Sequence, residues 1–284
     1  VLGPLLARFG EVKMPFPGGC AIGSRPIDLH LRGLTAMGAQ VSEEHGYIIV
    51  RAPRLSGAEI HLDFPSVGAT ENLMAAACLA SGTTIIRNAA REPEIVDEQN
   101  FLVRLGADIR GAGTDTIKVT GVTSLGSTSY SVMPDRIQAG TYMIAAAATR
   151  GDVTVTGVVP ELLDALVAKL AETGAAVICS EDSVRVAMGD RPGPIAVKSM
   201  PYPGFPTDLQ AQFMALLSLA NGMSIVTETV FENRFMHVYE LARMGAKIKI
   251  DGRAAIIEGV GGLSGAPGAA TDLRAGAALV IAGL

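Results

Sequence analysis

The thiol of Cys20 lies in a glycine-rich segment that also carries cationic and acidic side chains. In PFPGGCAIGSRPIDLHL, Arg25 stands five residues after Cys20, and Asp28 and His30 follow closely. Glycines let a backbone approach a ligand, while a planar guanidinium can clamp a phosphate and lower the pKa of a nearby thiol. The segment predicts a ligand-binding loop whose thiol acts as an acid or a nucleophile. The alternative is a small buried side chain beside a turn.

A second group of candidates stands at a predicted helix start in PYPGFPTDLQAQF. The prolines and the glycine force a turn, after which Thr207 and Asp208 open the helix. Helix capping alone would explain Asp208. A similar start, ATDLRAG, presents Thr271 and Asp272 and adds Arg274. Because a helix N-terminus with an arginine can hold an anion, the two starts also predict anion binding.

The segment TETVFENRFMHVYEL holds the charged residues Glu228, Glu232, Arg234 and His237. Its ordinary interpretation is a solvated loop followed by a helix start with a satisfied histidine. No His, Cys and acidic spacing in it resembles a metal site. The segments SVGATEN and GVGGLSGAPG lack the spacing of a nucleotide-binding loop. We therefore predict no metal and no cofactor.

A repeated α/β unit must position these candidates. A helix-like stretch that ends in Gly-Ala before a β-rich stretch occurs four times, and its glycines are separated by 68, 68 and 71 residues. These glycines are Gly38, Gly106, Gly174 and Gly245. A second series ends an apolar helix before a β-branched strand, at Gly10, Gly82, Gly151 and Gly222. The period predicts copies of one unit made of strand, helix, strand, helix and hairpin, with glycine at the helix C-cap.

Composition and charge restrict the class of protein. Of the 284 residues, 49% are hydrophobic but only 5% aromatic, so aliphatic side chains and Met must fill the core. Nearly all-apolar helices such as FMALLSLA must lie between sheets. A net charge of -5 without a long basic run argues against a nucleic-acid partner. The uncharged stretch 209–227 contains Gln, Ser and Asn, so we predict a buried helix running into a strand and no membrane partner.

The cysteines predict a reducing compartment. Cys20, Cys78 and Cys179 are odd in number and widely spaced, which builds neither a disulfide framework nor a zinc site. No basic segment followed by an apolar one marks a secretory signal, so we predict a cytoplasmic location. The chain begins at Val1, and both of its ends are expected to fall inside repeat units.

Six motifs, in their order along the chain, resemble those of the UDP-N-acetylglucosamine 1-carboxyvinyltransferase family. They are PGGCAIGSRPIDLHL, DFPSVGATEN, NAAREPEIVD, FPTDLQAQF, TETVFENRFMHV and ATDLRA. The similarity runs along nearly the whole chain, and the cysteine motif is highly specific. The sister family of 5-enolpyruvylshikimate-3-phosphate synthases shares the fold but not the cysteine loop. The resemblance implies an inside-out α/β barrel of repeated units, with two domains and the active site between them.

The resemblance also implies a domain boundary near Pro134. Residues 1–133 would form the first enolpyruvyl-transferase domain, which carries the Cys20 loop and is incomplete at its N-terminus. Residues 134–284 would form the second domain, which carries Asp208 and is incomplete at its C-terminus. Six repeat units are implied by the family and roughly four are present.

The implied reaction transfers the enolpyruvyl group of phosphoenolpyruvate to the 3-hydroxyl of UDP-N-acetylglucosamine and releases phosphate, the first committed step of peptidoglycan synthesis. By resemblance, Cys20 protonates C3 of phosphoenolpyruvate and is the thiol that fosfomycin alkylates, while Asp208 takes the hydroxyl proton. Arg25 would hold phosphate and Arg274 would face phosphoenolpyruvate. The residues implied to bind the substrates are Arg25, Pro26, Ile27, Asp28, Leu29, His30, Ser66, Val67, Gly68, Thr207, Asp208, Val230, Phe231 and Arg234.

Two alternatives remain beside this interpretation. One is a sister enolpyruvyl transferase that acts on another hydroxyl acceptor, and the other is a non-catalytic paralogue that binds a sugar nucleotide. The joint presence of Cys20, Arg25 and Asp208 argues against both. The family also uses a Lys-Asn pair and two further arginines that this chain lacks. Losing their charge stabilisation is expected to weaken or abolish activity of this chain by itself.

Overall fold

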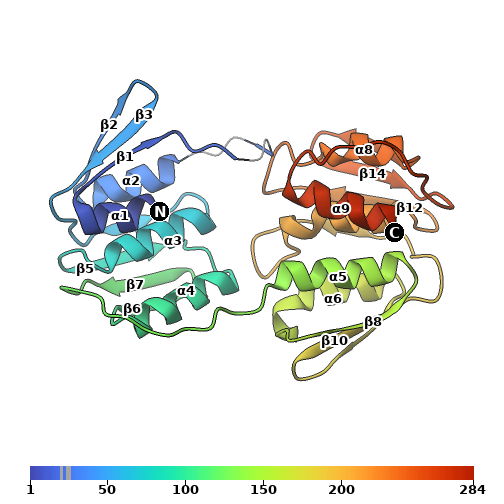
Figure 1. The fold of residues 1–284 in the computed structure, drawn as a ribbon, viewed down its shortest axis with the longest axis horizontal. Helices are drawn as coiled ribbons and strands as arrows, with labels where there is room; N and C mark the ends of the chain where they lie inside the picture. The colour runs from blue at the N-terminus through green and yellow to red at the C-terminus, as the bar shows by residue number, and fades with distance from the viewer. Residues whose placement is uncertain (20–21, 24–26) are drawn as a thin grey trace. The chain divides into compact units, whose positions relative to one another are not determined.

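The computed structural model describes residues 1–19, 22–23 and 27–284. It divides into two compact units (Figure 1), and the division falls between Met133 and Pro134. The first unit holds the described residues 1–19 and 27–133, and the second holds 22–23 and 134–284. Three predicted site residues, Cys20, Arg25 and Pro26, lie outside the described residues.

The described part of the first unit folds into helices and two sheets. Its helices are α1 (Leu2–Phe9), α2 (Asp28–Ala36), α3 (Val67–Ala77) and α4 (Pro93–Arg104). One sheet has the order β1-β3-β2, with antiparallel pairs only, and is formed by β1 (Glu11–Pro15), β2 (Gln40–Glu44) and β3 (Tyr47–Arg51). The other has the order β4-β5-β7-β6 and is formed by β4 (Glu59–His61), β5 (Thr83–Arg87), β6 (Asp108–Arg110) and β7 (Thr116–Thr120).

The second unit repeats this plan. Its helices are α5 (Arg136–Ala148), α6 (Asp164–Glu172), α7 (Gln210–Leu217), α8 (His237–Arg243) and α9 (Leu273–Gly283), with short 3-10 turns η1 (Pro160–Leu163) and η2 (Thr207–Leu209). The sheet β8-β10-β9 consists of β8 (Asp152–Thr156), β9 (Ala176–Cys179) and β10 (Ser183–Ala187). The sheet β11-β12-β14-β13 consists of β11 (Ala196–Lys198), β12 (Met223–Thr227), β13 (Lys247–Asp251) and β14 (Ala254–Glu258).

The predicted order of strand, helix, strand, helix and hairpin is present in both four-stranded sheets. In each sheet, the first strand pairs in parallel with the second (β4 with β5, β11 with β12). The last strand of the closing hairpin then pairs antiparallel with that second strand (β7 with β5, β14 with β12). A parallel pair needs a crossover connection, and the helices α3 and α7 supply it. The period read from the sequence therefore corresponds to one folded unit.

The glycines of the Gly-Ala series take the predicted left-handed conformation, with φ between 93° and 105° at all four positions. Glycine suits these helix ends because it has no Cβ to clash there. The prediction for the second series fails at Gly151, which does not have a positive φ. There the preceding residue, Arg150, takes the left-handed position with φ 54°. At this helix end, the left-handed residue therefore stands one position earlier than predicted.

Helices fill the interior of the second unit, and sheets cover it. All residues of α7 are buried, and α7 contacts α9 and α5. Figure 1 shows β8 and β10 lying on one side of α5 and α6. In β10, Val184 and Val186 are buried, whereas four of the five residues of β8 are exposed. Apolar helices on the inside and half-solvated sheets on the outside agree with the predicted inside-out arrangement.

The uncharged stretch 209–227 forms α7 and β12, which confirms the predicted buried helix that runs into a strand. Some of its polar side chains have internal partners, such as Gln212 Nε2, which donates to the Asp208 carbonyl at 2.9 Å, whereas the side-chain oxygens of Gln210 and Gln212 have none within the described chain. Within the part of the chain that the structure describes, no helix is long and apolar enough to cross a membrane.

Candidate active site

In the first unit, predicted site residues gather at the starts of α2 and α3. Asp28, Leu29 and His30 form the first turn of α2, and Ile27 precedes it. Ser66 is the N-cap of α3, and its Oγ accepts a hydrogen bond from the backbone N–H of Ala69 at 3.3 Å. Val67 and Gly68 open α3, where their backbone N–H groups lack partners inside the helix.

His30 joins the two helix starts. A Cβ placed on Gly68 would lie 3.6 Å from His30 Cε1, so the imidazole ring lies directly across this glycine. Burial lowers the pKa of His30, which keeps the ring neutral at neutral pH and able to donate one hydrogen bond. Two adjacent helix N-termini, with a neutral donor between them, form a suitable seat for phosphate oxygens.

In the second unit, Asp208 lies between two arginines. Arg234 Nη1 lies 2.8 Å from Asp208 Oδ1, and Arg274 Nη2 lies 2.5 Å from Asp208 Oδ2. Arg234 precedes α8 and is buried, with 5% of its side chain exposed, whereas Arg274 stands in the first turn of α9. The Asp208 side chain remains 35% exposed. Each carboxylate oxygen therefore has an arginine partner and can still accept a bond from a ligand hydroxyl.

The two arginines keep Asp208 ionised. Burial by itself would raise the pKa of this carboxyl group, but the charges of Arg234 and Arg274 and their hydrogen bonds outweigh it, so the pKa of Asp208 lies below its ordinary value. The carboxylate is thus ready to accept a proton or a hydrogen bond throughout the neutral range.

Behind Asp208, a chain of hydrogen bonds runs into the protein. Arg234 Nη1 also donates to Thr207 Oγ1 at 2.8 Å, and Thr207 Oγ1 donates to Glu228 Oε2 at 2.9 Å. Glu228 is 1% exposed, and its Oε1 accepts from the backbone N–H groups of Val230 at 2.8 Å and Phe231 at 3.1 Å. Direct contacts therefore join Arg274, Asp208, Arg234 and Thr207, and Glu228 connects Thr207 to the backbone of Val230 and Phe231.

Two interpretations of local sequence are wrong at this site. Asp208 is not a helix cap: it lies inside η2, the N-cap positions there are Pro206 and Leu209, and its carboxylate is held by arginines instead. By contrast, Asp272 does cap α9, where Oδ1 accepts from the backbone N–H of Arg274 at 2.9 Å. Arginines from elsewhere in the chain reach Asp208, and they determine the geometry of its side chain.

The segment from Glu228 to His237 is not the solvated loop with a satisfied histidine that its composition suggests. Glu228, Arg234 and His237 are all buried, and His237 Nε2 has no hydrogen-bond partner within the described chain. A run of polar residues does not by itself reveal that the fold will bury some of them. The sequence named Glu228 but gave no signal for its internal role.

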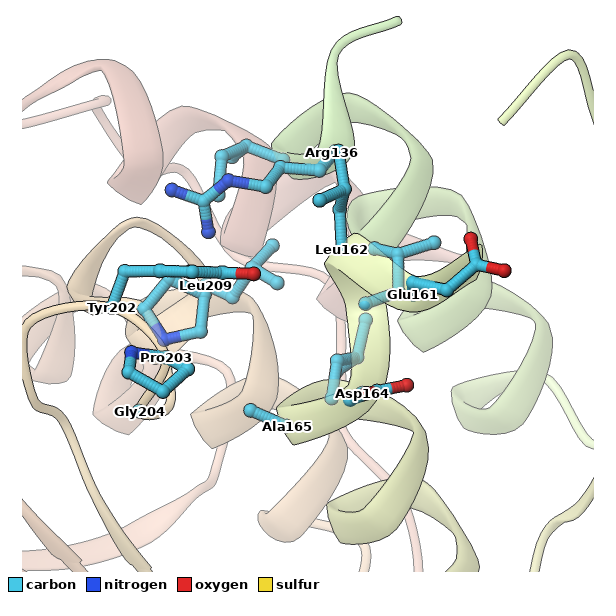
Figure 2. A pocket seen from close by; sticks show the side chains of 13 residues that line it. Arg136, Glu161, Leu162, Asp164, Ala165, Tyr202, Pro203, Gly204 and Leu209 are labelled. Atoms are coloured by element: carbon cyan, nitrogen blue, oxygen red, sulfur yellow. The ribbon is translucent and has the colours of Figure 1, made fainter. Parts of the chain in front are cut away.

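A small cavity lies beside η2 (Figure 2). It measures about 50 Å³ and is lined by Arg136, Tyr202, Leu209 and residues of the η1–α6 segment. The Arg136 guanidinium lies 5.6 Å from the centre of the Tyr202 ring. The cavity has room for a few water molecules, since about 10–15 Å³ suffices for one. It does not include Asp208 among its lining residues, so it is not part of the Asp208 site.

The sequence profile of the family described as EPSP synthase (3-phosphoshikimate 1-carboxyvinyltransferase) matches residues 1–284. The chain belongs to this family. Its relatives there include UDP-N-acetylglucosamine 1-carboxyvinyltransferase 1 of Carboxydothermus hydrogenoformans, 62% identical over 100% of this chain and 67% of that protein. The UDP-N-acetylglucosamine 1-carboxyvinyltransferase of Geotalea daltonii is 57% identical over 100% of this chain and 68% of that protein.

Solved structures agree with this enolpyruvyl transferase family. The enolpyruvyl transferase NikO from Streptomyces tendae superposes with a TM-score of 0.84 at 25% identity, over 99% of this chain and 68% of that chain. EPSP synthase from Acinetobacter baumannii superposes with a TM-score of 0.69 at 22% identity, over 99% of this chain and 69% of that chain. At this identity the similarity shows only that the fold is shared. The family resemblance and the repeated α/β fold predicted from the sequence are therefore confirmed.

Proposed function

We propose that the protein containing this chain transfers the enolpyruvyl group of phosphoenolpyruvate to the 3-hydroxyl of UDP-N-acetylglucosamine and releases phosphate. The observation that carries this proposal is the 62% identity to a UDP-N-acetylglucosamine 1-carboxyvinyltransferase along the entire chain. The ionised Asp208, held by Arg234 and Arg274, supports it, because the reaction needs an acceptor for a hydroxyl proton next to anion-binding groups.

The chemistry assigns a role to each group. The sugar hydroxyl adds to C2 of phosphoenolpyruvate while C3 gains a proton, and loss of that proton with phosphate then restores the double bond. Asp208 accepts the hydroxyl proton, and Arg274 stabilises the carboxylate and phosphate charges that develop beside it. Cys20 supplies the proton to C3, and Arg25 holds phosphate. Both of these residues lie outside the described part of the structure.

The sugar nucleotide is assigned to the remaining predicted residues. The starts of α2 and α3, with His30 and Ser66, offer N–H donors suited to its diphosphate. In the segment after β12, the N–H groups of Val230 and Phe231 are occupied by Glu228, so these residues would contact the sugar nucleotide through side chains and carbonyl groups. A cytoplasmic location belongs to the same proposal, supported by the free thiols of Cys78 and Cys179.

Phosphate release from phosphoenolpyruvate in the presence of UDP-N-acetylglucosamine tests the function in the full-length protein. We expect sugar-dependent release that fosfomycin and Cys20→Ala both abolish, while the exposed Cys179→Ala variant retains it. Asp208→Asn should lower kcat by about 10²–10⁴-fold, the usual loss when a positioned proton acceptor is removed. Asp190→Asn, an exposed carboxylate in a loop, serves as its control.

The alternative is a paralogue that binds the sugar nucleotide without catalysis. It would be favoured if the folded full-length protein bound UDP-N-acetylglucosamine in calorimetry but released no phosphate under any condition. Release with another hydroxyl acceptor, and none with this sugar nucleotide, would instead indicate a sister transferase.

A further inference from the structure

We propose that Glu228 is a positioning residue for the acceptor side of the reaction, because it fixes two contacts that orient Arg234 against Asp208. This inference rests on the proposed function. Glu228 itself does not touch the carboxylate of Asp208; it acts through Thr207 and Phe231. Neither the sequence motifs nor the family relationship assigned this residue a role.

The first contact is the hydroxyl of Thr207. A hydroxyl has one proton to donate, and Thr207 Oγ1 donates it to Glu228 Oε2 at 2.9 Å. Its lone pairs therefore face Arg234, whose Nη1 donates to Thr207 Oγ1 at 2.8 Å. The same Nη1 lies 2.8 Å from Asp208 Oδ1. The two hydrogen bonds, from Arg234 to Thr207 and from Thr207 to Glu228, keep this direction because the carboxylate of Glu228 can only accept.

The second contact is the ring of Phe231. The Arg234 guanidinium carbon lies 5.1 Å from the centre of this ring, within the range of a cation–π interaction. The backbone N–H of Phe231 donates to Glu228 Oε1, as does that of Val230. One buried carboxylate thus holds the hydroxyl on one side of Arg234 and the aromatic residue on another.

The burial of these groups makes the arrangement sensitive to change. Glu228 is 1% exposed and Arg234 is 4% exposed, so water cannot readily replace a lost partner. Arg234 Nε has no hydrogen-bond partner within the described chain, which makes the contacts at Nη1 and at the face of the guanidinium more important for its position. Loosening Arg234 would weaken its hold on Asp208 and shift the Val230–Phe231 segment.

The charged groups around Asp208 fix the sign of the expected pH effect. Arg234 before α8 and Arg274 on α9 lower its pKa against the opposing effect of burial. Glu228 accepts a hydrogen bond from Thr207, and the charges of Arg234 and Asp272 both act on His237. If Arg234 is loosened, one of the two stabilising cations is weakened and the pKa of Asp208 rises. Activity that needs the ionised carboxylate is then lost at a higher pH than in the wild type.

The test uses Glu228→Gln, Thr207→Val and Thr207→Ser in the full-length protein. In Glu228→Gln, the amide oxygen can still accept from Val230 and Phe231, but the amide nitrogen donates to Thr207 and reverses that hydrogen bond. Thr207→Val removes the hydroxyl without changing charge, and Thr207→Ser restores it. Glu258→Gln, which removes an exposed carboxylate paired with Lys247 on the sheet surface, is the matched control.

We expect Glu228→Gln and Thr207→Val to raise the KM for UDP-N-acetylglucosamine about tenfold, the factor that corresponds to one lost buried hydrogen bond. The KM for phosphoenolpyruvate should stay close to the wild-type value, and the acidic limb of the pH profile should move to higher pH. Thr207→Ser should restore both properties. A purely structural role would lower Tm without moving the acidic limb or separating the two KM values.

Folded Glu228→Gln and Thr207→Val variants with wild-type KM values and an unchanged acidic limb would overturn the inference. An equal loss toward both substrates would also overturn it. If Glu228→Gln fails to fold, the acidic limb of the pH profile of Thr207→Val decides the matter, because the loss of a direct substrate contact by Thr207 would raise KM without moving that limb. Absence of turnover in the wild-type protein would be a different result, because it would refute the proposed function before any variant was compared.

Discussion

His237 makes the stability of the protein depend on pH in a way that can be calculated. Its side chain is 1% exposed, and its Nε2 has no hydrogen-bond partner within the described residues. Burial is the largest cause that lowers the pKa of His237 from 6.5 to about 4; the nearby charge of Arg234 also lowers it, and Asp272 opposes them. The imidazole is therefore neutral in the folded protein at neutral pH.

The sign and size of the effect follow from proton linkage. Between pH 6.5 and about 4, the unfolded chain binds a proton at His237 that the folded protein does not bind. The folded state consequently loses stability as the pH falls through this window, and above it the group contributes no pH dependence. A shift from 6.5 to about 4 corresponds to about 3 kcal/mol, at about 1.4 kcal/mol per pKa unit.

The perturbation is His237→Gln, which removes the titrating group. The free energy of unfolding should be measured by urea denaturation of the full-length protein between pH 7 and pH 4. We expect the loss of stability over this range to be smaller in His237→Gln than in the wild type by about 3 kcal/mol, whatever the packing cost at pH 7. His61→Gln, at an exposed position on β4, is the control and should retain the wild-type pH dependence.

Parallel stability curves for the wild type and His237→Gln would refute this reasoning. They would mean that His237 is protonated in the folded protein or that it gains a partner at low pH. A direct NMR titration of the imidazole would separate these two explanations.

Further predictions concern the interior. Phe213→Ala should lower the free energy of unfolding by about 3–5 kcal/mol, because the ring is fully buried, whereas truncation of the exposed Phe101 should cost less in the same urea assay. Gly259→Ala should lower Tm, since a Cβ there would lie 1.8 Å from a backbone carbonyl oxygen; Gly189, with open space around it, should accept alanine. Burial raises the pKa of Glu98 to about 8, so stability falls between pH 4.5 and 8 as the unfolded chain releases this proton, and Glu98→Gln should flatten that fall. An unchanged Tm in Gly259→Ala would contradict the second of these predictions. Identical curves of unfolding free energy against pH for the wild type and Glu98→Gln would contradict the third.

The repeat and the family could be predicted from the sequence because both depend on local signals. The left-handed backbone conformation at a helix end favours glycine. Gly38 and Gly245 therefore mark helix ends whatever the tertiary contacts of those helices are. The specific cysteine motif identified the family without any coordinates. The order of strands and helices along the chain followed from the same signals.

The roles of the charged side chains could not be predicted in this way. Asp208 and Asp272 stand in similar local sequences, yet one pairs with two arginines and the other caps α9. Glu228 and His237 occur in a polar segment, yet both are buried.

The sequence by itself determined the repeated unit, its helix ends and the family, since each depends on short motifs, and the repeat on the regular recurrence of such motifs along the chain. Only the tertiary structure decided which charges meet. Arg274 reaches Asp208 from 66 residues away and Thr207 reaches Glu228 from 21 residues away. Such contacts form when segments distant along the chain fold together, within one repeat unit or between two, and burial then fixes protonation states and hydrogen-bond directions that local sequence leaves open.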